Sequence, residues 1–275
     1  MMKDVRNKRW KQVTAPFRML PVFLIPGEAK CGTTSLFRYL ALHPEIAASD
    51  IKEPNNFWRF GASPLWCRQH YPLRATSVFR KCLGKQTVPG EASPEYLSKA
   101  CVPASVAELC PDPLLIFLFR DPVERAFSDH HMLVKAGIET VSFEKRVEET
   151  LSWIADPGMT EVLERLGELE HHPARYVMRG AYLKNLAPWL QQFGREKMLF
   201  LESESFFANP GKVVARTLGF LGLDPIKKTD WPVYKKGRDK QPMDEGTRRK
   251  LRDYYAPLNR KLFDFLGEEW SWPAS

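Results

Sequence analysis

Six consecutive apolar residues, Leu114 to Phe119, constrain the fold of this chain more than any other feature. Pro113 precedes the run, and Asp121-Pro122 follows it closely. A run so short and so apolar is typical of a central strand of a parallel sheet, which is buried on both faces. Parallel strands need long crossover connections, usually helices. The run therefore predicts an α/β domain with a central parallel sheet flanked by helices.

Strand-like and helical patterns alternate along the rest of the chain, as a parallel sheet requires. We expect further strands at 22–25, 87–89 and 197–201. We expect helices at 33–43, 123–134, 142–169, 175–193, 210–221 and 244–266, and a loop at 224–242. No stretch has a linker composition, so we expect an N-terminal extension over residues 1–20 and a single domain over residues 21–270.

Composition excludes several classes of protein. The 275 residues are 44% hydrophobic and 27% charged, which is typical of a folded domain. No apolar run is long enough to span a bilayer. As written, the chain predicts a cytoplasmic protein; a lost N-terminal anchor would change that prediction. The net charge of +8 favours an anionic partner over a neutral one, although a solvated basic surface would also give it. Nucleic acid is not favoured, because the basic residues are dispersed and no nucleic-acid-binding motif occurs.

The cysteines and acidic residues show no metal-binding pattern. The five cysteines are odd in number and lack the close pairs of a zinc site, so we expect free thiols in a reducing compartment. Aspartate and glutamate residues do not cluster, and no metal is implied.

A glycine-bearing loop, Gly27 to Gly32, joins the first predicted strand to the first predicted helix. Such a loop directs backbone N–H groups and the positive end of a helix dipole at one point, where they bind phosphate. The spacing fits the general pattern G-x-x-x-x-G-K-[ST], but Thr33 stands where that pattern has lysine, and Lys30 lies inside the loop. This departure argues against an ATP or GTP hydrolase. A glycine turn before a core helix is the alternative.

The loop and its helix resemble the 5′-phosphosulfate-binding loop of sulfotransferases that use 3′-phosphoadenylyl sulfate (PAPS), whose pattern is Pro-Lys-x-Gly-Thr-Thr-x-Leu. Ala29 replaces the proline. Further segments resemble the same family in the same order. They are Lys52-Glu53-Pro54 with Phe57-Trp58, Gly90 to Pro94, Arg120 to Ser128, Tyr182 with Trp189, Lys236-Gly237-Arg238, and Tyr254-Tyr255.

The resemblance covers residues 22–270 and implies a P-loop-like domain. It is strongest to the carbohydrate branch, notably N-acetylgalactosamine 4-sulfate 6-O-sulfotransferases and heparan sulfate sulfotransferase domains. It implies that PAPS donates a sulfuryl group to a hydroxyl of a glycosaminoglycan-like acceptor by in-line displacement, leaving 3′-phosphoadenosine 5′-phosphate (PAP).

The resemblance also implies a role for each matching residue. Lys30 would stabilise the leaving 5′-phosphate, and Glu53 would act as the general base toward the acceptor hydroxyl. An arginine fork and a hydroxyl suit the 3′-phosphate. The residues implied in PAPS binding are Lys30, Cys31, Gly32, Thr33, Thr34, Ser35, Arg120, Ser128, Lys236, Gly237 and Arg238. Those implied at the acceptor are Lys52, Phe57 and Trp58.

Alternatives to this reading remain open. His130 and His131 are rival candidates for the base. A cytoplasmic sulfotransferase for a small hydroxylated metabolite and a P-loop kinase are rival enzymes, and a catalytically silent PAP-binding module is a rival of another class. No motif encodes the acceptor or the oligomeric state.

Overall fold

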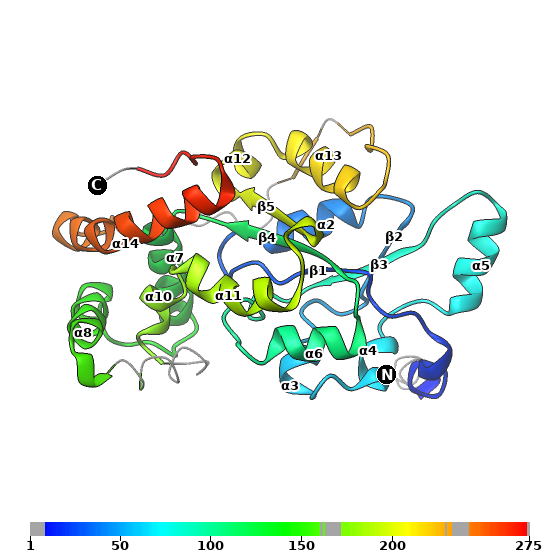
Figure 1. Cartoon of the computed structure of the whole chain (residues 1–275), viewed down its shortest axis with the longest axis horizontal. Coiled ribbons are helices and arrows are strands. Elements are labelled where there is room, and N and C mark those ends of the chain that lie inside the picture. The colour runs from blue at the N-terminus through cyan, green and yellow to red at the C-terminus, as the bar shows by residue number, and fades with distance from the viewer. Residues whose placement is uncertain (1–8, 160–161, 163–171, 229, 233–241, 274–275) are drawn as a thin grey trace.

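A parallel sheet of five strands, in the order β2-β3-β1-β4-β5, forms the centre of the computed structural model (Figure 1). The structure describes residues 9–159, 162, 172–228, 230–232 and 242–273. The strands are β1 Phe23–Ile25, β2 Ile46–Ala48, β3 Val88–Ala92, β4 Leu114–Phe119 and β5 Met198–Glu202. The α/β fold with a central parallel sheet is thus confirmed.

The six-residue apolar run forms β4, which lies between β1 and β5. Its alternate side chains enter different cores. Leu115, Phe117 and Phe119 belong to the core on one face of the sheet. Ile116 and Leu118 belong to the core on the other face. The run is continuously apolar because both faces are covered.

Helices cover both faces of the sheet (Figure 1). Helices α2 and α13 contribute to one core, and α6 and α11 contribute to the other. Helices α7, α8, α10 and α14 enclose a third apolar cluster beside the sheet. The α-helices are α2 Thr33–Leu40, α3 Asn56–Arg59, α4 Pro64–Arg68, α5 Arg74–Cys82, α6 Val102–Leu109, α7 Pro122–Lys135, α8 Phe143–Ala155, α10 Arg175–Met178, α11 Tyr182–Gln192, α12 Ser203–Ala208, α13 Pro210–Phe220 and α14 Glu245–Leu266. Short 3₁₀ helices are η1 Ala15–Phe17, η2 Pro157–Met159 and η3 Arg195–Lys197.

Two predicted helices differ from the observed ones. The helix expected over 142–169 ends at Ala155, because Asp156 precedes a proline and adopts extended backbone. Most of the remainder, 160–161 and 163–171, lies outside the described residues. The helix expected over 175–193 is broken into α10 and α11 at Gly180. A Cβ there would lie 2.6 Å from Oη of Tyr255, so α14 packs directly on the backbone at this break.

The predicted N-terminal extension packs against the domain in its described part. Arg18 is buried, and its Nη1 donates to the carbonyl of Tyr71 at 2.7 Å. Its own carbonyl accepts a hydrogen bond from Arg68 in α4 at 2.6 Å. Among the helices that the structure describes, none combines the length and hydrophobicity that crossing a bilayer requires.

The direction of the strand order reverses beside β1. From β1 the chain runs to β2 at one edge and returns through β3, whereas β4 and β5 lie on the other side of β1. Open parallel sheets bind ligands in the crevice at such a switch point, at the carboxyl ends of the strands. This edge is where the candidate residues are expected to meet.

Candidate functional site

The glycine loop leaves the carboxyl end of β1 and enters α2, as expected. Gly32 caps the helix with φ +94°, a left-handed conformation that favours glycine. A Cβ at Gly32 would also lie 2.9 Å from the ring of Phe207. Burial alternates along the loop: Lys30, Gly32 and Thr34 are partly exposed, whereas Cys31, Thr33 and Ser35 are buried. The accessible face therefore combines a lysine with the N-terminus of a helix, which suits an anion.

Two neighbouring elements hold the loop backbone, and a third contacts the Lys30 side chain. The N–H of Glu28 donates to the carbonyl of Leu118 in β4 at 3.3 Å. Ser203, at the start of α12, donates its hydroxyl to the carbonyl of Cys31 at 2.7 Å. Burial raises the pKa of the Cys31 thiol to about 12, so this side chain is neutral. Lys30 has φ 70°, and its Nζ lies 3.6 Å from Sδ of Met132 in α7.

Arg120 follows β4 directly and lies against the loop. Its Nη1 is 3.5 Å from the carbonyl oxygen of Lys30, and its Nε is 4.0 Å from a carboxylate oxygen of Glu204. Ser128 lies about two turns into α7 and is largely buried. Because Ser128 and Met132 are four residues apart on one helix face, Ser128 shares the face that reaches Lys30. The structure thus brings the two sequence motifs together at one edge of the sheet.

Glu53 lies between β2 and α3, at the same edge of the sheet. It adopts φ 57°, and its carboxylate pairs with Lys52. The following residues are held by hydrogen bonds: Nδ2 of Asn55 donates to the carbonyl of Glu53 at 3.1 Å, and Nε1 of Trp66 donates to the carbonyl of Pro54 at 3.4 Å. About a third of the Glu53 side chain is exposed, which leaves it accessible to a ligand.

The aromatic pair after Glu53 divides between core and surface. Phe57 is buried and packs edge-on against Tyr96, with ring centroids 5.7 Å apart. Trp58 is half-buried, with the ammonium of Lys99 4.4 Å and the guanidinium of Arg59 4.9 Å from its ring centroid. Phe57 therefore anchors this segment in the core, whereas the ring of Trp58 makes cation–π contacts with Lys99 and Arg59.

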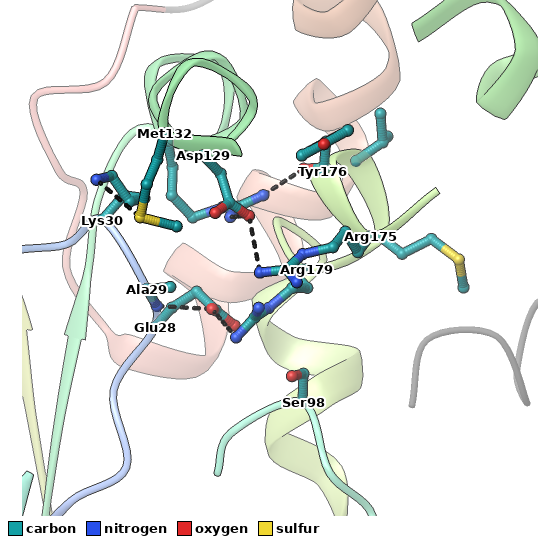
Figure 2. Close-up of polar contacts among 12 residues, drawn as sticks. Glu28, Ala29, Lys30, Ser98, Asp129, Met132, Arg175, Tyr176 and Arg179 are labelled. Carbon is teal, nitrogen blue, oxygen red and sulfur yellow. Dashed lines mark hydrogen bonds and ion pairs between the residues drawn. The ribbon is translucent and has the colours of Figure 1, made fainter. Parts of the chain in front are cut away.

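A buried ion pair supports the loop from behind (Figure 2). Nη2 of Arg179 lies 2.6 Å from a carboxylate oxygen of Glu28, and both side chains are almost fully buried. Nη1 of Arg179 also donates to Glu95 at 3.1 Å. Burial raises the pKa of Glu28, while Arg179 opposes that shift. The same Glu28 carboxylate accepts from the N–H of Ala29 at 2.6 Å, which fixes the first turn of the loop.

Two further arginines extend this network to α7. Nη1 of Arg125 and Nη2 of Arg175 lie 3.4 and 3.5 Å from the same oxygen of Asp129. Despite burial, Arg175 and Arg125 lower the pKa of Asp129, so it remains ionised. Figure 2 shows Asp129 close to Met132 and Lys30. We define the buried ion network as these six residues: Glu28, Glu95, Arg125, Asp129, Arg175 and Arg179.

His130 and His131, the alternative candidates for the general base, both contact backbone carbonyl groups. Nε2 of His130 lies 2.8 Å from the carbonyl of Val141, and burial lowers its pKa. Nδ1 of His131 lies 3.0 Å from the carbonyl of Phe127 in its own helix.

All five cysteines are free, as predicted. Within the described part of the chain, no three potential ligands gather in a metal-type cluster. Lys236, Gly237 and Arg238 lie outside the described residues.

Sequence reasoning missed the buried ion network, although two signals pointed to it. Arg125 and Asp129, and likewise Arg175 and Arg179, are spaced four apart on helices whose neighbouring residues are buried. Charges at that spacing on a buried face need partners. Which acids they meet depends on how α7, α10 and the glycine loop pack, and spacing alone does not give that.

The chain is similar in sequence to known proteins. Residues 20–231 match the family model of the sulfotransferase domain. The chain is 28% identical to heparan sulfate glucosamine 3-O-sulfotransferase 3B1 of Mus musculus over 93% of its length and 65% of that protein's. It is 28% identical to carbohydrate sulfotransferase 15 of Rattus norvegicus, covering 92% of this chain and 54% of that one. The chain thus spans between half and two thirds of these relatives.

A solved structure shares the fold. The crystal structure of a sulfotransferase from Alicyclobacillus acidocaldarius superposes with a TM-score of 0.69 at 26% identity, covering 92% of this chain and 98% of that one. The family model spans all five strands and the described residues of the glycine loop, Glu53, Arg120 and Ser128. The chain therefore belongs to the sulfotransferase domain family.

Proposed function

We propose that this domain transfers a sulfuryl group from PAPS to a hydroxyl of an acidic carbohydrate. One observation supports the proposal most: Lys30, Glu53 and Arg120 each follow the carboxyl end of a different strand of the parallel sheet. The glycine loop offers a helix N-terminus to the 5′-phosphosulfate, and Arg120 with Ser128 offers a guanidinium and a hydroxyl to the 3′-phosphate. The residues present fit PAPS, with Lys236, Gly237 and Arg238 proposed to complete the 3′-phosphate site.

The proposed reaction is an in-line displacement at sulfur. Glu53 takes the proton of the acceptor hydroxyl as that oxygen bonds to sulfur. The bond between sulfur and the 5′-phosphate oxygen breaks, and Lys30 stabilises the negative charge that develops on this oxygen. The products are the sulfate ester and PAP. The polypeptide mainly positions the reactants and stabilises charge.

Two observations favour a saccharide acceptor. The relatives are named as heparan sulfate and carbohydrate sulfotransferases. The chain also carries a net charge of +8, which attracts a sulfated or carboxylated chain. Lys52 and Trp58, which lie beside Glu53 in the sequence, are proposed to face the acceptor, with Phe57 supporting them from the core.

A transfer assay with radiolabelled PAPS tests the proposal. The acceptors are chondroitin sulfates, heparan sulfate and a simple phenol. We expect label in a polysaccharide and, for Glu53→Gln, a fall in kcat of about 10²–10⁴-fold, the usual contribution of a general base. Glu108→Gln, an exposed carboxylate on α6, is the matched control and should retain full activity. Label in the phenol alone would instead support a small-metabolite enzyme, and full activity of Glu53→Gln would remove Glu53 as the base.

A further inference from the structure

Glu91 is a buried carboxylate with no role in the proposed chemistry, and it is linked by hydrogen bonds to the segment that follows Glu53. Glu91 is near the carboxyl end of β3 and is fully buried. The hydroxyl of Ser93 donates to its Oε2 at 2.8 Å, and the hydroxyl of Tyr96 donates to its Oε1 at 3.1 Å. Both carboxylate oxygens are therefore occupied by hydroxyl donors.

The same two hydroxyls accept hydrogen bonds from the backbone on either side of Asn56. The N–H of Asn55 lies 3.4 Å from Oγ of Ser93, and the N–H of Phe57 lies 3.4 Å from Oη of Tyr96. Two relays thus run from Glu91 to the backbone two and four residues after Glu53. We call them the Ser93 relay and the Tyr96 relay.

The segment held by these relays has unfavourable backbone. Glu53 and Asn55 adopt φ 57° and 51°, in the left-handed region that side chains with a Cβ avoid. Such conformations persist only when the surrounding structure enforces them, and they concentrate at functional sites. The Ser93 relay ends on the N–H of Asn55, one of the two strained residues, and Asn55 in turn binds the carbonyl of Glu53.

We propose that Glu91 is a positioning residue, whose ionised carboxylate orients the Ser93 and Tyr96 hydroxyls so that they hold Glu53 toward the acceptor. This inference rests on the proposed function, in which Glu53 is the base. Glu91 acts through other groups and does not touch the reacting atoms.

The relays depend on the charge of Glu91. An ionised carboxylate accepts from both hydroxyls, which leaves each hydroxyl oxygen free to accept a backbone N–H. A protonated carboxyl must donate to one of them, and the hydrogen of that hydroxyl then loses its acceptor in a buried site. Burial raises the pKa of Glu91 to about 7, so both forms occur near neutral pH. The titratable groups that face it are Cys67 of α4, Tyr71, Tyr96 and Cys110, and burial raises the pKa of each of them.

Glu91→Gln imitates the protonated form at every pH, because its amide group donates where the carboxylate accepts. The test measures kcat against pH for the whole chain, and PAP affinity by calorimetry. In the wild type we expect kcat to rise as pH increases through about 7. In Glu91→Gln we expect this rise to disappear and kcat to fall by roughly tenfold to a hundredfold, the effect of a small misplacement of the base. PAP affinity should not change.

Glu202→Gln is the matched control, because Glu202 ends β5, at the edge of the sheet away from β3, and also accepts from serine hydroxyls. Its kcat and pH profile should match those of the wild type. Unchanged kcat and pH profile in Glu91→Gln overturn the inference, whatever Glu53→Gln does. Full activity of Glu53→Gln overturns the proposed function instead. If Glu91→Gln does not fold, Ser93→Ala combined with Tyr96→Phe removes both relays, and a wild-type profile in that variant also overturns the inference.

Discussion

Lys30 and Glu53, the two residues proposed to act on the reacting atoms, both adopt left-handed backbone without being glycine. Each such residue costs of order 1–3 kcal/mol, which the surrounding contacts must offset. The carbonyl of Lys30 accepts from Arg120, and the carbonyl of Glu53 accepts from Asn55. Residues flanked by strained backbone and fixed in this way lose little freedom when ligands arrive, which suits groups that must be oriented before the reaction.

At the residue scale, Arg120 is the residue that we propose to discriminate PAP from 5′-AMP. Arg120→Ala removes a charge-assisted hydrogen bond donor, which contributes about 1.5–3 kcal/mol. We expect PAP affinity to fall by about 10–100-fold while 5′-AMP affinity changes little. Calorimetric titration of both nucleotides checks this, with Arg38→Ala, outside the loop on α2, as the control. Equal losses for the two nucleotides would contradict a 3′-phosphate role for Arg120.

Glu91 also makes stability depend on pH. Its pKa rises from 4.5 to about 7 in the folded state because it is buried, so the folded chain holds the proton more tightly than the unfolded chain. The stabilisation is fully present below about pH 4.5 and is lost as pH rises through 7. Between pH 5 and pH 8 we expect the free energy of unfolding of the wild type to fall by about 2 kcal/mol relative to that of Glu91→Gln. Denaturant unfolding at both pH values measures this, and an equal difference at both would contradict it.

At the scale of elements, the buried ion network joins the glycine loop to α7 and α10. Arg179→Gln leaves the buried Glu28 without its partner, and we expect a loss of about 3 kcal/mol in unfolding free energy. Glu28→Gln combined with Arg179→Gln should lose less than the sum of the two single changes, because no buried charge of this pair remains unpaired. A double-mutant cycle in urea measures this coupling, expected at about 1–3 kcal/mol. Strict additivity would show that the two side chains do not interact.

Element types were predictable wherever local pattern decides them. The run that became β4 is apolar on both faces. Helices α13 and α14 end just before Gly222 and Gly267, glycines with positive φ, so the positions of these ends could be inferred from sequence. β2 and helices α3, α4, α5, α6 and α12 were missed because each is nine residues or fewer, too short to give a clear periodic pattern. The Gly180 break was missed because it reflects the approach of Tyr255 from α14.

The candidate site likewise contains residues that a local motif predicts and residues that only the packing of distant segments brings in. Lys30, Glu53, Arg120 and Ser128 could be proposed from the sequence because they lie in contiguous motifs. Glu91 lies in the matched segment Gly90 to Pro94, yet its relation to Asn55 depends on β3 and the segment after β2 meeting in space. Sequence patterns point to residues that could contact a ligand. They say less about the residues that hold those side chains in place, because such contacts depend on how distant segments pack.

At the scale of the whole molecule, net charge separates the two classes of acceptor. Attraction between a basic domain and an anionic polysaccharide is screened by salt, with a Debye length of about 10 Å at 0.1 M. We expect KM for a sulfated polysaccharide to rise severalfold between about 50 and 200 mM salt, because added salt weakens the binding of a polyanion. KM for a neutral phenol should stay constant. A salt-independent KM for the polysaccharide would contradict an electrostatic acceptor surface.

We propose that the switch point beside β1 binds a nucleotide with phosphates at both the 5′ and 3′ positions. The most direct test is calorimetric titration of the full chain with PAP, 5′-AMP and ATP, without added metal. The glycine loop and Arg120 together predict that PAP binds much more tightly than 5′-AMP. Equal affinity for PAP and 5′-AMP, or ATP binding that exceeds PAP binding once magnesium is added, would contradict the account and favour a kinase-like use of the glycine loop.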